Sequence, residues 1–118
     1  MIENLLLLYQ KYGVSIVPGE RNHSFPVVKV VSYNVRKVNK EAIKLSVPFS
    51  SMMFCVLLHE LGHILSYEVG SYSPEDNIIN REIQAWQFGE EFYSGSFPLE
   101  YNIIKSAQLD RVREHSNT

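Results

Sequence analysis

Two histidines and a glutamate stand close together near the middle of the chain, in His59-Glu60-Leu61-Gly62-His63. Residues four apart lie on one face of an α-helix, one turn from each other, so both imidazoles can bind the same metal ion. Glu60 is offset by one position and flanks that face, where a carboxylate can accept a proton from a water on the metal. On a helix, this spacing predicts a zinc site with His59 and His63 as ligands and Glu60 as the catalytic base.

A catalytic zinc site needs a third protein ligand and leaves its fourth position open for water. Glu82 is the favoured candidate, because it shares a predicted helical face with apolar residues such as Ile78, Ala85 and Trp86. A carboxylate on such a face points to the core, where binding to a cation removes the cost of burying its charge. The alternative for Glu82 is a buried salt bridge, for which Arg81 is close in sequence.

Other histidines fit the third position less well. His23 falls in a predicted turn and His115 in a predicted tail, so both are interpreted as solvated side chains. The metzincin pattern is excluded, because Ser66 and Val69 stand where that class has glycine and histidine. The alternative for the motif itself is a pair of core histidines, with Glu60 bound to a basic side chain at the surface.

The pattern of apolar residues places the candidate ligands on helices. From Ser50 or Ser51 to Gly70 the chain is apolar on every side, which predicts a helix through the middle of the core. Ser73-Pro74-Glu75-Asp76 combines a capping serine, a proline at the first helical position and acidic side chains, so a second helix is expected from there to about Tyr93. Two further helices are expected, over Ile2–Tyr12 and Leu99–Glu114.

Three short segments rich in β-branched residues predict a small sheet, which is expected to be antiparallel because turn residues separate them. The segments are Val14–Val17, Val27–Tyr33 and Ala42–Val47. Basic side chains around the last segment are interpreted as charges that protect the edge of a hairpin; they are Arg36, Lys37, Lys40 and Lys44. The expected fold is α+β, with the sheet packed on the motif helix and the Glu82 helix completing the site.

The composition is typical of one soluble domain. The chain has 118 residues, of which 45% are apolar and 20% charged, so a single domain over residues 1–118 is expected, with a frayed tail at 115–118. No segment is expected to be long enough and free enough of charge to cross a membrane, and the acidic opening does not have the form of a signal peptide. The single cysteine, Cys55, indicates a reducing and therefore cytoplasmic location. The net charge of −2 argues against direct binding to nucleic acid.

These residues resemble the ImmA/IrrE metallopeptidases, a family in the gluzincin group, over roughly Leu5 to Pro98. The similarity rests on the opening segment Leu6–Val17, on Ile43–Leu45, on His-Glu-Leu-Gly-His and on the segment Glu82–Phe88. Only the two metal-binding motifs are specific to the family.

By that resemblance Glu82 is the family's glutamate ligand, and Ala85 and Phe88 are its small and aromatic packing positions. Trp86 departs from the family, which usually has asparagine after the alanine.

The resemblance implies a zinc-dependent endopeptidase that holds one Zn²⁺ and cuts a cytoplasmic protein, typically a helix-turn-helix repressor, at one site. A bare domain of this size is similar to those encoded by phages and mobile elements. One alternative is a catalytically silent zinc-binding or protein-interaction module, against which the presence of Glu60 counts. A nucleic-acid-associated protease of the SprT type would need a third histidine and a basic surface. The oligomeric state stays open.

Overall fold

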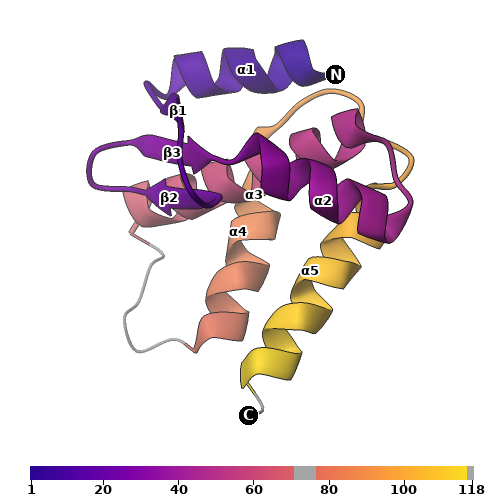
Figure 1. Cartoon of the computed structure of the whole chain (residues 1–118). Helices are drawn as coiled ribbons and strands as arrows, with labels where there is room; N and C mark the ends of the chain where they lie inside the picture. The colour runs from indigo at the N-terminus through magenta and orange to yellow at the C-terminus, as the bar shows by residue number, and fades with distance from the viewer. Residues whose placement is uncertain (71–76, 117–118) are drawn as a thin grey trace.

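The apolar segment after Pro48 forms the central helix, α3 (Phe49–Glu68), of the computed structural model, which describes residues 1–70 and 77–116. The helix runs through the middle of the fold and is buried on most sides (Figure 1). Gly70 follows it with a φ of 76°, in the left-handed conformation that ends many helices. The prediction of a buried helix that carries the histidine motif is therefore confirmed.

Helices α4 (Ile78–Phe92) and α5 (Tyr101–Ser116) pack beside each other and against α3 (Figure 1). Asn77 caps α4, because its side chain accepts a hydrogen bond from the amide of Asn80. The predicted start of this helix, Ser73–Asp76, lies outside the described residues. Both helices run close to the predicted ranges.

Helix α1 (Ile2–Lys11) lies on the other side of the sheet from the start of α4 and the end of α5 (Figure 1). It ends just before Gly13, whose φ of 68° is readily adopted only by glycine. The first predicted helix is thus confirmed.

The segment Ala42–Val47 was predicted as a strand, but most of it forms the end of another helix, α2 (Val35–Leu45). Asn34 starts α2, since its side chain accepts a hydrogen bond from a backbone amide of the first turn. Val38 and Ala42, one turn apart, are buried in the core and fix the orientation of the helix. The prediction was wrong because it gave more weight to the β-branched residues near the end of α2 than to this helical spacing.

Four basic residues assigned to the edge of a hairpin therefore lie on a helix. They are Arg36, Lys37, Lys40 and Lys44, and all four are exposed on α2.

The sheet has three strands in the order β1-β3-β2 and is mixed rather than antiparallel. β1 (Ser15–Pro18) runs parallel to β3 (Val30–Tyr33), whereas β2 (His23–Phe25) pairs antiparallel with β3. His23 therefore lies in a strand and not in the predicted turn. The α+β class is confirmed, but the strand nearest to the motif helix is one that the sequence pattern did not indicate.

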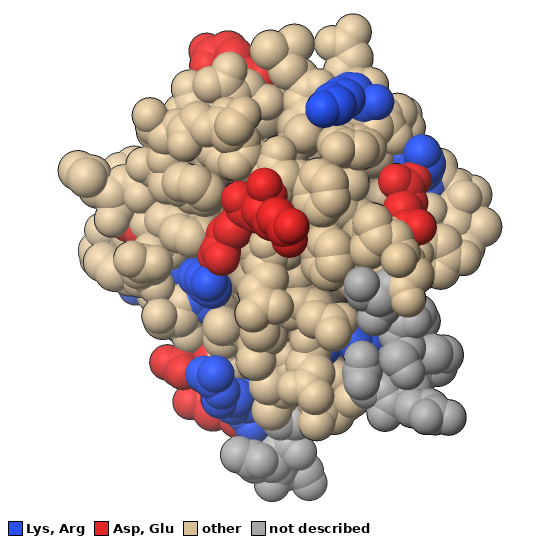
Figure 2. Space-filling model, turned by 180° about the vertical axis from the view of Figure 1, so that it is seen from behind, with Lys and Arg blue, Asp and Glu red and all other residues tan. Residues whose placement is uncertain are grey.

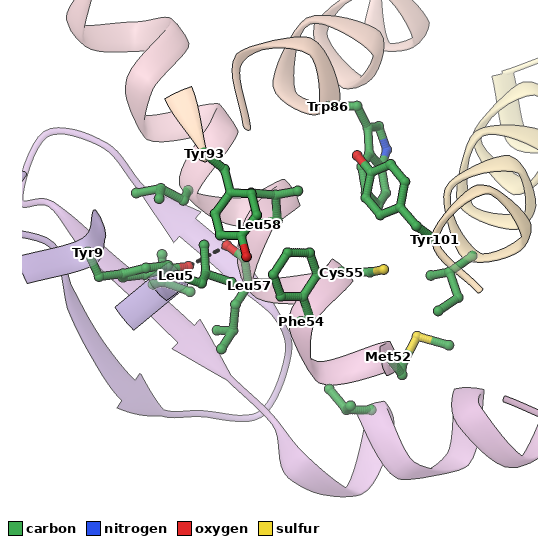
Figure 3. Close-up of a cluster of buried hydrophobic side chains, with 14 of the residues drawn as sticks. Leu5, Tyr9, Met52, Phe54, Cys55, Leu57, Leu58, Trp86, Tyr93 and Tyr101 are labelled. Carbon is green, nitrogen blue, oxygen red and sulfur yellow. Dashed lines mark hydrogen bonds between the residues drawn. The ribbon is translucent and has the colours of Figure 1, made fainter. Parts of the chain in front are cut away.

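Large apolar side chains join α3 to its neighbours (Figure 3). The hydroxyl of Tyr9 in α1 donates a hydrogen bond to the carbonyl of Leu57 at 2.5 Å. On the other side, the rings of Trp86 and Tyr101 meet edge to face, with centroids 5.7 Å apart. These contacts fix α1, α4 and α5 around the helix that carries the motif.

Within the described ranges, α3 is also the one helix long and apolar enough to cross a membrane. The expectation that no segment would meet this criterion was wrong. Of the apolar window, 72% is buried inside the fold, as in the core helix of a soluble protein.

Candidate metal centre

The three candidate ligands meet where α3 crosses α4. Oε2 of Glu82 lies 2.5 Å from Nε2 of His63 and 3.4 Å from Nε2 of His59. His59 is buried, while the side chains of His63 and Glu82 are 27% and 16% exposed, so the centre is open on one side. Residues predicted from two separate helices thus come together in one place.

Gly62 allows the two helices to approach this closely. A Cβ atom at position 62 would lie 1.8 Å from the carbonyl oxygen of Ala85 and 2.6 Å from its carbonyl carbon. These are backbone atoms, which can move only if α4 itself moves. The glycine inside the histidine motif therefore sets the distance between His63 and Glu82.

The donor set of this centre suits zinc. Two imidazole nitrogens and one carboxylate oxygen are the ligands of many catalytic zinc ions. Nε2 of His59 is buried and has no hydrogen-bond partner among the described residues, a situation that costs about 1–3 kcal/mol unless something pairs with the atom. Ligand atoms around a tetrahedral zinc stand roughly 3.3 Å apart, close to the 3.4 Å between His59 and Glu82. The 2.5 Å between His63 and Glu82 is instead a hydrogen-bond distance, in a contact that a metal would replace. The donor types and the unpartnered nitrogen of His59 therefore fit a zinc ion.

Glu60 is buried beside these ligands and is held by Ser24 of β2. The hydroxyl of Ser24 lies 2.6 Å from Oε1 of Glu60 and 2.7 Å from its backbone oxygen, and donates its one proton to either. The other carboxylate oxygen, Oε2, lies 3.6 Å from Nδ1 of His59. The ligand-type atoms of His59, Glu60 and His63 all lie within 4.8 Å of one another. Glu60 is thus oriented from outside its own helix.

The two glutamates and the histidines shift each other's proton affinities. Burial raises the pKa of Glu60, but the neighbouring histidines and Ser24 lower it below its ordinary value overall. Burial also raises the pKa of Glu82, and both histidines then lower it far below the ordinary value. Burial lowers the pKa of His59, but the two carboxylates raise it to about 9. Two ionised carboxylates in a buried place favour a cation, which is either a proton on an imidazole or a metal ion.

Trp86 and Gln108 hold Glu82 from behind. Nε1 of Trp86 donates to Oε1 of Gln108 at 2.7 Å, and Nε2 of Gln108 donates to Oε1 of Glu82 at 2.9 Å. The indole also stacks on the His59 ring, with centroids 4.8 Å apart and 22° between the planes. Oε2 of Glu82 is thereby left to face the histidines. Trp86 is thus part of the structure around the site.

The sequence did not indicate Ser24 or Gln108, and it placed Trp86 on the helical face of Glu82 without a role at the site. Ser24 lies in a strand of three residues, too short for a recognisable alternation. Gln108 lies on α5 without any motif around it. The one signal in the sequence for a place of Trp86 beside Glu82 was their four-residue spacing, which puts both on one helical face.

Two hollows open onto the centre. One lies between α2 and α5, has a volume of about 710 Å³ and reaches His59, Glu60 and Glu82. The other lies between β2 and α4, has a volume of about 560 Å³ and also reaches His63. A polypeptide segment can therefore approach Glu60 from either side.

No family model, curated protein or solved structure matches the chain. The functional interpretation therefore rests on the geometry of the centre.

Proposed function

We propose that the chain is a zinc-dependent endopeptidase that binds one Zn²⁺ through His59, His63 and Glu82. The observation that carries this proposal is the meeting of these three side chains at a helix crossing, next to a buried, ionised Glu60. The two hollows support it further, because a substrate needs access to the centre.

Zinc at this centre would supply Lewis acidity, which lowers the pKa of a water from about 16 to about 7. Glu60 is the residue that takes the proton from the attacking water and delivers it to the leaving amine. Ser24 binds Oε1 of Glu60, so Oε2 is the oxygen available for this transfer. Gln108 keeps Glu82 in its orientation throughout.

The proposed substrate is a cytoplasmic protein cut at one site, such as a helix-turn-helix repressor. An extended substrate segment can add to the free edge of a sheet through backbone hydrogen bonds. Ala42–Val47 cannot provide such an edge, because most of this segment is helical. In this proposal the substrate segment pairs with β2, since β2 is an edge strand and Ser24 within it contacts Glu60.

The proposal is tested by separating metal binding from activity. The parent should contain about one zinc per chain by elemental analysis, and His59→Ala and Glu82→Ala should lose it. Glu60→Gln should keep the zinc and the fold but lose cleavage of candidate repressors, because an amide cannot accept the proton.

Two results would contradict the proposal. Full zinc content in Glu82→Ala would remove this residue from the ligands, and parent-like cleavage by Glu60→Gln would remove Glu60 from the mechanism. Stoichiometric zinc without cleavage of any protein by the parent would instead favour a catalytically silent zinc-binding or protein-interaction module.

A further inference from the structure

The hollow between α2 and α5, here called the α2 groove, has an apolar floor. Its floor includes Val38 of α2, Met52 and Val56 of α3, and Ile104 of α5. At its inner end the groove reaches Glu60 and the other residues of the metal centre. A bound segment that lies in the groove therefore leads directly to the proposed site of cleavage.

One wall of the α2 groove is basic. Lys37, Lys40 and Lys44 line it from α2, and Arg21 lines it beside β2. All four side chains are exposed, and within the described part of the chain none of them forms an ion pair. Their charge is therefore available to a bound molecule.

The acidic side chains of the groove are largely matched already. Glu41 of α2 forms an ion pair with Arg111 of α5, at 3.1 Å. Asp110 forms one with Arg113, at 3.3 Å. Apart from the carboxylates of the metal centre, Glu114 is the remaining acidic residue that lines the groove. Four cations without an ion pair among the described residues thus share the groove with Glu114 and with the carboxylates of the metal centre, and they lie together on one wall.

The basic wall is a local feature and does not reflect a basic protein. The chain has a net charge of −2. On the face opposite to that of Figure 1, charged side chains are few and scattered, and basic ones do not gather (Figure 2). The exposed lysines of the α2 wall are therefore a local concentration of positive charge.

We propose that the α2 groove binds an acidic stretch of the substrate polypeptide, on one side of the bond that is cut. This inference rests on the proposed function for the position of that bond. The apolar floor accepts side chains between the acidic residues, and the basic wall pairs with their carboxylates. A nucleic acid fits less well, because four cations beside an apolar floor offer few of the clustered phosphate contacts on which such binding depends.

The test measures binding of labelled synthetic peptides by fluorescence anisotropy, in a zinc-loaded Glu60→Gln background that cannot cut them. The peptides share one apolar sequence and differ in three adjacent positions, which are all glutamate, all glutamine or all lysine. The glutamate peptide should bind about tenfold more tightly than the glutamine peptide, and the lysine peptide more weakly still.

A matched pair of charge reversals locates the effect. Lys37→Glu with Lys40→Glu should abolish the preference for glutamate, because both residues line the groove. Arg36→Glu with Lys11→Glu makes the same change of charge at exposed positions that do not line it, and should keep the preference. Circular dichroism checks that both variants are folded.

Equal binding of the glutamate and glutamine peptides to the zinc-loaded Glu60→Gln protein would overturn the proposal. Loss of the preference in both double variants alike would overturn it as well, since the effect would then be one of net charge. The peptidase function is judged separately, by cleavage with the parent. If the glutamate peptide binds preferentially but the parent cleaves no peptide, the proposed role of the α2 groove is supported and the peptidase function is contradicted. If the parent cleaves the glutamate and glutamine peptides with the same kcat/KM, the peptidase function is supported and the role of the groove is contradicted.

Discussion

Both carboxylate oxygens of Glu82 have partners, and the contact that orients the side chain matters for metal binding as much as the contact with the histidines. Oε2 faces His59 and His63, while Oε1 accepts a hydrogen bond from Gln108, which Trp86 holds in turn. Partners of this kind fix the orientation of a metal ligand before the metal binds. The zinc affinity of the centre should therefore depend on a residue that does not touch the metal.

Gln108→Ala should lower the affinity for zinc about 10–100-fold, because Glu82 loses the donor that orients it. A competition titration with a coloured chelator measures this change. Gln87→Ala is the matched control, since this glutamine lies on α4 but is exposed, and it should bind zinc like the parent. Unchanged affinity in Gln108→Ala would show that Glu82 is oriented by its own helix alone.

Trp86 offers a direct signal of metal binding, because it is the single tryptophan of the chain and stacks on His59. Cobalt(II) bound in place of zinc should quench its fluorescence strongly at about one equivalent. His59→Ala should remove the quenching at that ratio. Equal quenching of the parent and of His59→Ala would place the cobalt elsewhere.

At the scale of helices, the close crossing of α3 and α4 decides whether the ligands can meet. An exposed helical glycine that is changed to alanine usually stabilises a protein, by about 1 kcal/mol. At Gly62 the sign should reverse, because a Cβ would overlap the backbone of Ala85. We expect Gly62→Ala to destabilise the fold by about 3 kcal/mol and to weaken zinc binding, as the helices move apart.

Thermal denaturation and zinc content measure the two effects of Gly62→Ala. Ser50→Ala, at an exposed position in the first turn of the same helix, is the control and should change neither. A Gly62→Ala protein as stable as the parent would mean that α3 and α4 are farther apart than described here.

Helix α2 shows why local residue preferences predict some elements and not others. Ile43 and Val47 favour a strand by residue type, but Val38 and Ala42 are spaced to bury one helical face. The helix cap, Asn34, lies eight positions before the predicted strand. The sequence pattern therefore did not show that Asn34 starts a helix that continues into this segment. Proline at Lys44 would therefore interrupt the end of a helix.

Across the molecule, a contact of the site could be predicted from the sequence only where the residues that form it lie close together along the chain. His59, Glu60 and His63 share one helix, and helical periodicity is a local property. Ser24 contacts Glu60 across 36 positions, and such a contact exists only once the sheet and the helix have packed.

Glu82 lies between these two cases, whereas Gln108 belongs with Ser24. The apolar face of its own helix marked Glu82 as a residue that points to the core. Gln108 lies 26 positions further along the chain, and its contact with Glu82 follows from the packing of α5 on α4, for which the sequence carries no local pattern.

Zinc at this centre would join α3 to α4 directly and α5 through Gln108, so its removal should weaken the whole fold and not one loop. A ligand present at 100 times its dissociation constant stabilises the native state by about 2.7 kcal/mol. For a domain of this size, that corresponds to a fall in Tm of roughly 10 °C when a chelator removes the metal. Calorimetry with and without chelator measures the shift, and His59→Ala with His63→Ala should show none. If the parent held one zinc per chain but melted at the same temperature after its removal, the metal would bind the unfolded chain as tightly as the native fold, which a site built by the crossing of α3 and α4 does not allow.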